Sequence, residues 1–189
     1  MKKIGFCFTG SFCTFSRAFA ALVELTNEGY DVVPIMSENA YYTDTRFALA
    51  EEFSKRVETL TGKKIIHTIT DAEPLGPKEV LDCLVIAPCT GNTLAKAALG
   101  ITDTAATMAI KAHLRSDRPT LMALATNDAM SQNLGNIGAM LKRKSVFFVP
   151  LKQDDTVGKP HSLVAEFELI PKALHALERN EQLRPLFVY

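Results

Sequence analysis

Several features that would point to a specialised class of protein are missing from this sequence. Its 189 residues contain no tryptophan, and the 21 basic and 21 acidic residues leave no net charge. A balanced charge gives no electrostatic reason to expect nucleic acid or an anionic membrane as a partner. No apolar run approaches the roughly 20 residues that a membrane-spanning helix needs. We therefore predict one globular domain over residues 1–189, with neither a membrane nor a nucleic acid as its partner.

Cysteine is scarce and follows no recognisable pattern. The four cysteines, Cys7, Cys13, Cys83 and Cys89, show no C-x-x-C spacing, and two of them fall in apolar runs. This is typical of reduced thiols in the cytoplasm, and we predict no metal site. The G-x-G-x-x-G fingerprint of a standard dinucleotide-binding loop is also absent.

What is present is an alternation of strands and helices. Apolar runs predict six strands, at residues 3–8, 31–36, 64–70, 83–87, 120–125 and 145–149. Segments with apolar residues at helical spacing lie between and after them, including residues 12–28, 44–60, 93–99, 104–115, 131–141 and 162–179. Six strands joined by helical crossovers predict an α/β fold with a doubly wound, mostly parallel sheet.

Polar turns follow three of these strands, at residues 9–11, 88–93 and 125–130. The carboxyl ends of parallel strands meet at one edge, where ligands bind in open α/β sheets, so the three turns should converge there. The Thr9-Gly10-Ser11 turn offers a glycine and two hydroxyls beside a helix N-terminus, which suits a single phosphate group. Ser37 follows the second strand and would reach the same anion. A plain helix cap is the alternative explanation for these residues.

Motifs in all three turns resemble those of a known family. Residues 87–96, APCTGNTLAK, with Gly100 to Asp103, are similar to the P-A-S-A-N-T motif and downstream G-x-x-D of the homo-oligomeric flavin-containing cysteine decarboxylases. Residues 5–11 resemble that family's phosphate-binding turn, and residues 127–130 resemble the end of its P-x-M-N-x-x-M motif, without the proline. The resemblance implies a Rossmann-like, flavodoxin-type fold, a homo-oligomer and bound FMN. The predicted FMN-binding residues are Gly10, Ser11, Ser37, Pro88, Thr90, Gly91, Asn92 and Thr93.

Further stretches narrow the resemblance to one branch of this superfamily, the B subunits of a two-subunit synthase. They are residues 72–77, 86–103, 111–115, 148–150 and 159–165. This branch implies formation of pyridine-2,6-dicarboxylate from a dihydro precursor of the lysine pathway. It also implies a separate A subunit that binds NAD(P), and a location in the cytoplasm of the mother cell of sporulating bacteria.

One departure from the decarboxylases bears on the activity. They carry a catalytic histidine shortly before the P-A-S-A-N-T strand, whereas residues 73–77 contain none and His67 lies too far upstream. We therefore do not expect cysteine decarboxylation. Aromatising a dihydropyridine removes two electrons and two protons, which requires a flavin or a nicotinamide. The chain is expected to be an oxidoreductase subunit, active with its partner. The alternatives are a cofactor-free subunit that holds substrate for that partner, and an FMN-dependent decarboxylase of another substrate.

A small dicarboxylate substrate needs cations or N–H donors around it. The candidate residues are Lys111, His113, Arg115, Lys159 and His161. We predict Lys159 and His161 as the substrate-binding pair, because they lie in a polar loop that could close over the sheet edge as a lid. A solvated surface charge is the alternative for each of them. Asn92 and Asn127 are the predicted catalytic residues, since an amide can both donate to and accept from a planar heterocycle.

Overall fold

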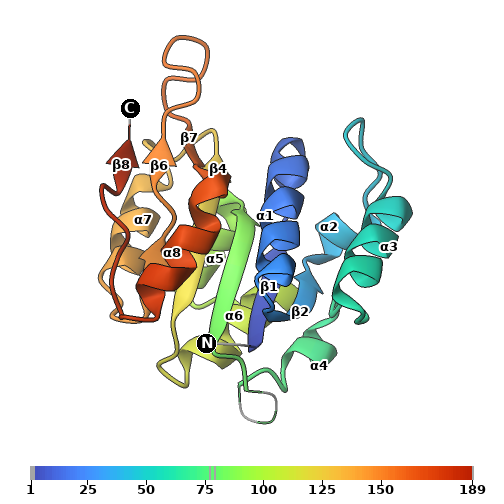
Figure 1. The fold of residues 1–189 in the computed structure, drawn as a ribbon. Coiled ribbons are helices and arrows are strands. Elements are labelled where there is room, and N and C mark those ends of the chain that lie inside the picture. The colour runs from blue at the N-terminus through green and yellow to red at the C-terminus, as the bar shows by residue number, and fades with distance from the viewer. Residues whose placement is uncertain (1–2, 77, 79, 189) are drawn as a thin grey trace.

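The structure, a computed structural model, describes residues 3–76, 78 and 80–188, and shows a twisted sheet between two layers of helices (Figure 1). The strands within these residues are β1 (Lys3–Phe8), β2 (Asp31–Met36), β3 (Cys83–Cys89), β4 (Thr120–Thr126), β5 (Val146–Phe148), β6 (Leu151–Lys152), β7 (Leu163–Ala165) and β8 (Phe187–Val188). The helices are α1 (Phe15–Asn27), α2 (Glu38–Tyr42), α3 (Ala50–Thr61), α4 (Ile69–Ala72), α5 (Gly91–Leu99), α6 (Ala105–Leu114), α7 (Leu134–Leu141) and α8 (Ile170–Leu177). Two short 3-10 turns, η1 (Phe12–Thr14) and η2 (Phe167–Leu169), precede α1 and α8.

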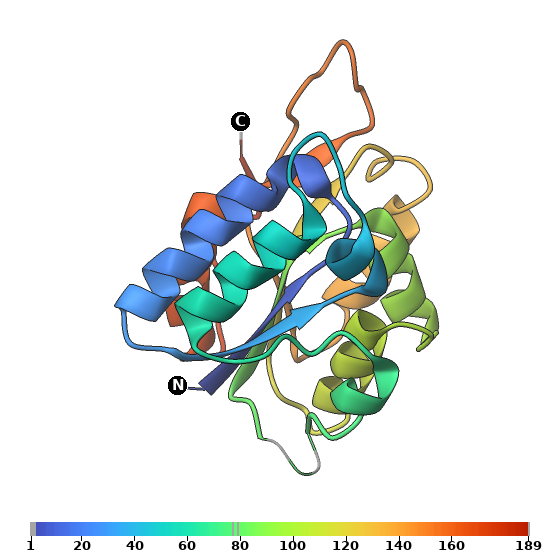
Figure 2. The same ribbon diagram turned by 90° about the vertical axis from the view of Figure 1, so that its right-hand side faces the viewer.

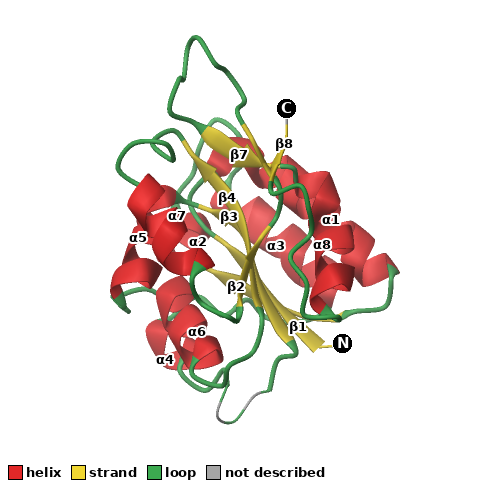
Figure 3. Cartoon of the chain, turned by 90° about the vertical axis from the view of Figure 1, so that its left-hand side faces the viewer, coloured by secondary structure: helices red, strands yellow, loops and turns green. Residues whose placement is uncertain are grey.

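The parallel part of the sheet has the strand order β2-β1-β3-β4-β5. The chain runs outward from β1 to β2 and then returns to β3 on the other side of β1. This reversal creates a switch point between β1 and β3, where ligands bind in flavodoxin-type sheets. Helices α1, α3 and α8 cover one face of the sheet, and α5, α6 and α7 cover the other (Figures 2 and 3). The predicted α/β, mostly parallel fold is confirmed.

The strands of the sheet are apolar because helices cover both of its faces. All seven residues of β3 are buried, and the strand runs two residues beyond its expected end at residue 87. On the α1 side, Phe53 packs its ring against those of Phe8 and Phe15, with centroid distances of 5.2 and 4.7 Å. These contacts fix the beginning of α1 beside the end of β1.

The sheet differs from the expected six strands at two places. Residues 64–70 were predicted to form a strand, which is wrong: only Ile66 makes an isolated bridge, to Ile35. The Thr68 hydroxyl instead accepts a hydrogen bond from the Asp71 N–H and caps α4. The other difference is a set of three short strands, β6, β7 and β8, that extend the sheet beyond β4, with β7 antiparallel to the end of β4.

Two helices also begin six or more residues later than predicted. The helix expected from residue 162 begins at Ile170, with Pro171 in its first turn, and β7 occupies part of the earlier segment. The helix expected from residue 44 begins at Ala50, and α2 forms before it. The apolar spacing over residues 44–60 also predicts that Phe47 faces inward, which is wrong, because Phe47 precedes α3 and is 51% exposed. The sequence also predicts a loop over residues 71–77 and a short helical piece after it. Residues 77 and 79 of these segments lie outside the described residues.

No helix in the described ranges is long and apolar enough to cross a membrane. All four cysteines are free thiols. Cys7, Cys83 and Cys89 are buried within strands, and burial raises the pKa of Cys89 to about 12. These three thiols therefore act as packing groups in the core.

Candidate functional site

Thr9 ties the carboxyl ends of β1 and β3 together. Its hydroxyl donates to the Pro88 carbonyl over 2.7 Å and accepts from the Thr90 N–H over 2.9 Å. The side chain is buried, with 1% of the residue exposed. Its hydroxyl is therefore already used within the protein. Of the two hydroxyls that the sequence placed in the phosphate turn, the Ser11 hydroxyl is the one left for a ligand.

Two neighbouring hollows open at this junction, and both are lined by Gly10, Thr90 and Asn92. The β2-side hollow has a volume of about 490 Å³, and its other lining residues are Ser37, Glu38, Asn39, Thr93, Lys96, Asp103 and Thr104. The β4-side hollow has a volume of about 470 Å³, and its other lining residues are Ser11, Cys13, Thr14, Arg17, Gly91, Ala125, Thr126, Asn127, Asp154, Lys159 and Val164. The three turns predicted from the sequence therefore do meet at one edge.

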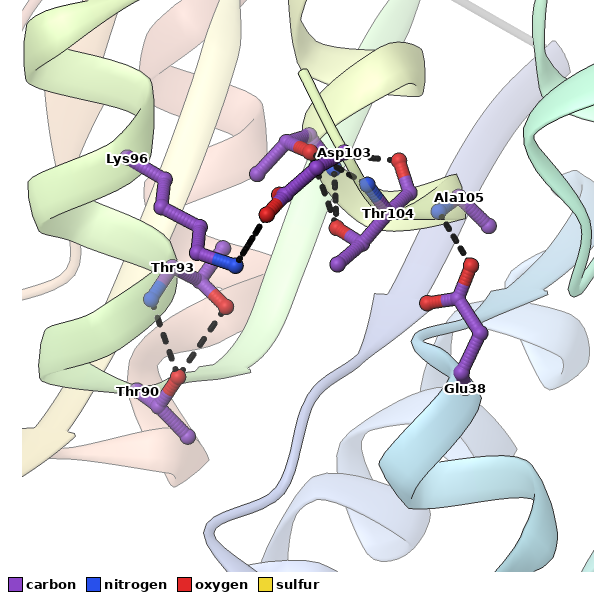
Figure 4. Close-up of polar contacts among 8 residues, drawn as sticks. Glu38, Thr90, Thr93, Lys96, Asp103, Thr104 and Ala105 are labelled. Carbon is purple, nitrogen blue, oxygen red and sulfur yellow. Dashed lines mark hydrogen bonds and ion pairs between the residues drawn. The ribbon is translucent and has the colours of Figure 1, made fainter. Parts of the chain in front are cut away.

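In the β2-side hollow, Glu38 has an unused hydrogen-bond acceptor (Figure 4). One carboxylate oxygen of Glu38 accepts from the Ala105 N–H, at the start of α6, over 3.0 Å. The other oxygen, Oε2, is buried and has no hydrogen-bond partner. A buried oxygen of this kind costs free energy unless a ligand or water donates to it. Glu38 Oε2 is thus available to accept a hydrogen bond from a molecule bound in this hollow.

The lysine of the β2-side hollow is neutralised by a carboxylate. Lys96 donates to both oxygens of Asp103, over 2.9 and 2.8 Å (Figure 4). This hydrogen bonding lowers the pKa of Asp103 below its usual value. Lys96 therefore joins α5 to the segment before α6, and the pair adds no net charge to the hollow.

The first turn of α5 is held by its own cap and by close packing. The Thr90 hydroxyl accepts from the Thr93 N–H over 3.1 Å and so caps the helix. A Cβ on Gly91 would lie 2.5 Å from the Thr126 hydroxyl and 2.6 Å from the Asn133 amide nitrogen. Only glycine leaves room for these groups. The next residue, Asn92, lines both hollows.

The polar groups behind Gly91 form one network. The Thr126 hydroxyl donates to Asp128 over 2.5 Å. The Asn133 amide donates to both oxygens of Asp128, over 3.0 Å each. The network fixes the turn after β4, from which the exposed Asn127 lines the β4-side hollow.

Two cations line the β4-side hollow, Arg17 and Lys159, and each pairs with a carboxylate in the C-terminal part of the chain. Arg17 makes a bidentate pair with Glu168, at 2.9 and 2.8 Å, which raises the pKa of Arg17 further. Lys159 donates to Asp154 over 3.0 Å, and this bond raises the pKa of Lys159. The loop 153–161, which carries both Asp154 and Lys159, projects away from the sheet (Figure 2, orange).

The structure brings most of the predicted site residues together. Of the predicted FMN-binding residues, seven line at least one of the two hollows: Gly10, Ser11, Ser37, Thr90, Gly91, Asn92 and Thr93. Pro88 is buried within β3, where its carbonyl accepts from Thr9. Lys159 lines the β4-side hollow, whereas His161 is not among its lining residues. The His161 carbonyl accepts from the Met130 N–H over 2.9 Å.

The other candidate cations lie away from this edge. Lys111 and Arg115 line a separate hollow beside α6. His113 is fully buried, and its Nε2 lies 2.9 Å from the Pro119 carbonyl. Burial lowers the pKa of His113 to about 4, so the ring is neutral at pH 7. His113 is therefore a structural residue, which corrects its prediction as a carboxylate-binding cation.

Sequence reasoning missed Glu38, Arg17 and the pairing of Lys96 with Asp103. The serine at 37 followed by a glutamate is a signal for the start of a helix, and it could have predicted α2 and the position of Glu38. The partners of Arg17 and Glu38 are distant in the sequence and leave no local signal.

Residues 1–170 match the model of the Flavoprotein family, and the chain belongs to that family. The chain is similar to the B subunit of dipicolinate synthase from Bacillus subtilis (strain 168), with 44% identity over 187 residues, or 99% of this chain and 94% of the relative. It is also similar to the crystal structure of the same B subunit from Bacillus halodurans C, with 37% identity and a TM-score of 0.91, covering 100% of this chain and 96% of that one. The resemblance to the flavoprotein superfamily and its B-subunit branch is confirmed.

A more distant structure shares the fold alone. The FMN-dependent cysteine decarboxylase SpaF has 22% identity and a TM-score of 0.67, covering 95% of this chain and 97% of its own. The flavodoxin-type arrangement thus extends to proteins whose sequences have diverged widely from this one.

Proposed function

We propose that this chain binds FMN at the β1/β3 edge and acts as the second subunit of a two-subunit oxidoreductase that forms pyridine-2,6-dicarboxylate from a dihydro precursor. A separate A subunit would bind NAD(P), and the chain would work as a homo-oligomer in the cytoplasm of sporulating cells. The observation that carries the proposal is the 44% identity to the B subunit of dipicolinate synthase over 99% of the chain. An alignment of that extent includes all three turns of the edge.

The residues at the edge fit a flavin mononucleotide. Each hollow lies within the usual volume range of ligand pockets, and they adjoin at Gly10, Thr90 and Asn92. Ser37 uses its oxygen to accept from the Ala40 N–H, so its hydroxyl hydrogen is free to donate to a phosphate oxygen. The unpartnered Oε2 of Glu38 would accept from one of the hydroxyls of the ribityl chain. Donors and acceptors are therefore available for both parts of the cofactor.

The protein's own residues would bind and orient the substrate. Bound FMN would supply an acceptor for the two electrons that aromatisation releases. Asn92 and Asn127 would hold the ring of the substrate through their amides, since both are exposed at the β4-side hollow. Lys159 would neutralise one substrate carboxylate, sharing its charge with Asp154.

The position of His67 supports an activity other than cysteine decarboxylation. Its ring stacks on Tyr41, with centroids 3.8 Å apart and planes 7° apart. It lies among the lining residues of neither edge hollow. We expect the purified chain to release no carbon dioxide from peptidyl cysteine or phosphopantothenoyl-cysteine.

Purification tests the flavin assignment directly. A yellow protein with absorbance near 450 nm, a general property of oxidised flavin, supports it, and a colourless protein that binds no added FMN favours a cofactor-free subunit. Ser11→Asp would place a negative charge at the phosphate turn and should weaken FMN binding by about tenfold or more. Ser16→Asp is the matched control, because Ser16 is exposed in the first turn of α1 and lines neither edge hollow. Equal FMN affinity in Ser11→Asp and the unaltered chain would contradict the placement.

Reconstitution tests the need for a partner. The chain should form pyridine-2,6-dicarboxylate only when mixed with a second polypeptide that binds a nicotinamide. Complete synthesis by this chain alone would refute the two-subunit assignment, whatever its flavin content.

A further inference from the structure

A third hollow lies between α5, α6 and the end of α7, on the side of the molecule that Figure 3 shows at its left. Its volume is about 310 Å³, and it shares no lining residue with the two edge hollows. Its walls come from Ala97 in α5, the turn at residues 100–102, one face of α6, and Arg143 after α7. The function proposed above makes no use of it.

The floor of this hollow is apolar. Ala97 and Ile110 are buried, and Leu114 is half-buried. Ile110 and Leu114 are four residues apart on α6, so they lie on one face of the helix. Ile101 adds an apolar wall and is itself 43% exposed. A ligand with an apolar body would cover this surface and gain from its removal from water.

Three cations surround the apolar floor. Lys111 lies in the last turn of α6, Arg115 directly follows that helix, and Arg143 approaches from beyond α7. All three are exposed, and no carboxylate is among the lining residues. No ion pair joins any of them to another described residue. The lysines of the edge hollows, by contrast, each have a carboxylate partner.

The dipole of α6 does not account for this arrangement. Lys111 and Arg115 complement the negative C-terminal end of α6, as basic residues commonly do. Arg143 comes from a different element and has no such role towards α6. Three positive charges around one hollow repel one another, and a bound anion would relieve that repulsion.

We propose that this hollow binds a small ligand that carries two carboxylates on a planar apolar ring. The ring would cover Ile101, Ile110 and Leu114, and the carboxylates would accept hydrogen bonds from Lys111, Arg115 and Arg143. An arginine side chain can donate two parallel hydrogen bonds to one carboxylate. The two arginines therefore favour a carboxylate over an anion that offers a single acceptor atom. The hollow is separate from the sheet edge, and the choice of a ring dicarboxylate rests on the function proposed above, whose product has this chemistry.

The test uses benzene-1,3-dicarboxylate as the probe and the full chain with labelled isoleucine and leucine methyl groups. NMR titration should give saturable shifts at Ile101, Ile110 and Leu114. The double variant Lys111→Gln/Arg115→Gln should weaken binding by about tenfold or more, because two of the three charge-assisted contacts are lost. Inorganic phosphate, which has the charge without the ring, should not displace the probe at equal concentration.

The matched control is Lys142→Gln/Lys144→Gln. It also removes two exposed positive charges, on either side of Arg143, but neither residue lines the hollow. It should change the dissociation constant by less than about twofold, since neither side chain would contact the probe and salt screens exposed charges. Equal weakening by the two double variants would show a general charge effect and would overturn the proposal.

Two further results would also overturn it. One is the absence of saturable methyl shifts up to about 10 mM probe, a concentration at which any useful affinity would be visible. The other is a combination of two observations. The assembly formed by Lys111→Gln/Arg115→Gln has a different mass from that of the unaltered chain, and the unaltered chain binds no probe. The cations would then belong to a contact between protein chains.

Discussion

The two hollows at the sheet edge are built from different parts of the chain. All residues that line the β2-side hollow lie between Gly10 and Thr104, within the βα units that form the parallel sheet. The β4-side hollow also requires Asp154, Lys159 and Val164, which follow the last parallel strand. The first hollow is thus a property of the doubly wound core, whereas the second depends on how the C-terminal segment packs against it.

The two hollows also differ in the groups they offer. The β2-side hollow has a neutralised lysine and a spare carboxylate oxygen on Glu38, which suits hydroxyl donors of a ligand. The β4-side hollow has Lys159 and the exposed amides of Asn92 and Asn127. We therefore expect variants of Glu38 in the first to change cofactor affinity. Variants of Asn92, Asn127 and Lys159 should change the KM for substrate, whereas Ser11, which also lines the second hollow, belongs to the phosphate turn.

The largest effect is expected where packing forms one wall of the β4-side hollow. Gly91→Ala would force a Cβ against the Thr126, Asp128 and Asn133 network, at 2.5 to 2.9 Å. Overpacking of this kind should lower the free energy of unfolding by about 2–3 kcal/mol, measured by urea denaturation. Gly10→Ala is the control, because its nearest neighbour would be 3.6 Å away, and it should stay within about 0.5 kcal/mol. A loss in Gly91→Ala as small as that in Gly10→Ala would show that the network yields to the new methyl group.

The parallel half of the fold could be predicted from the sequence because burial on both faces produces apolar runs. The run from Cys83 to Ala87 is such a strand, and the polar turn after it had to lie at the carboxyl edge. The C-terminal part could not be predicted in this way. Leu163 and Phe167 have the spacing of a helix with Ile170, yet residues 163–165 pair with the end of β4. A long-range pairing there overrides the local pattern.

The same distinction applies to the candidate site. Turn residues such as Gly10 and Asn92 could be recognised because their types and positions are local properties. The bond from Ala105 to Glu38 joins residues 67 apart, and the pair of Arg17 with Glu168 joins residues 151 apart. Nothing in the sequence shows which distant partner will hold each charge, so the electrostatics of the two hollows emerged only from the fold.

A change at Thr9 should affect both hollows equally, because Thr9 joins the two strands between which they open. Thr9→Val keeps the shape of the side chain but leaves the part-buried Thr90 N–H without its acceptor. We expect a loss of about 1–2 kcal/mol in the free energy of unfolding. Thr9→Ser keeps the hydroxyl and should recover most of that loss. If the valine and serine variants are equally stable, the hydroxyl is not the link between β1 and β3.

Glu38→Gln should alter cofactor binding with little change in stability. The glutamine oxygen can still accept from the Ala105 N–H, while an amide nitrogen replaces the free carboxylate oxygen. Loss of one charge-assisted hydrogen bond to a ligand hydroxyl should weaken FMN binding by about tenfold. Quenching of flavin fluorescence measures this affinity, and the KM for substrate should stay constant. An unchanged FMN affinity would mean that the spare oxygen does not contact the cofactor.

The smallest effect is expected at the exposed rim of the β4-side hollow, where Lys159 and His161 can be separated. Lys159 lines the hollow but is 49% exposed at its side chain and already paired with Asp154, so a substrate carboxylate would share its charge. Exposed ion pairs contribute up to about 1 kcal/mol, so Lys159→Ala should raise the KM of the reconstituted enzyme by no more than about fivefold. His161→Ala should leave the KM unchanged, because that side chain is not among the residues lining the hollow. FMN affinity should be the same in both variants. A larger rise in KM for His161→Ala than for Lys159→Ala would mean that the loop 153–161 rearranges when substrate binds, and that the β4-side hollow is completed only then.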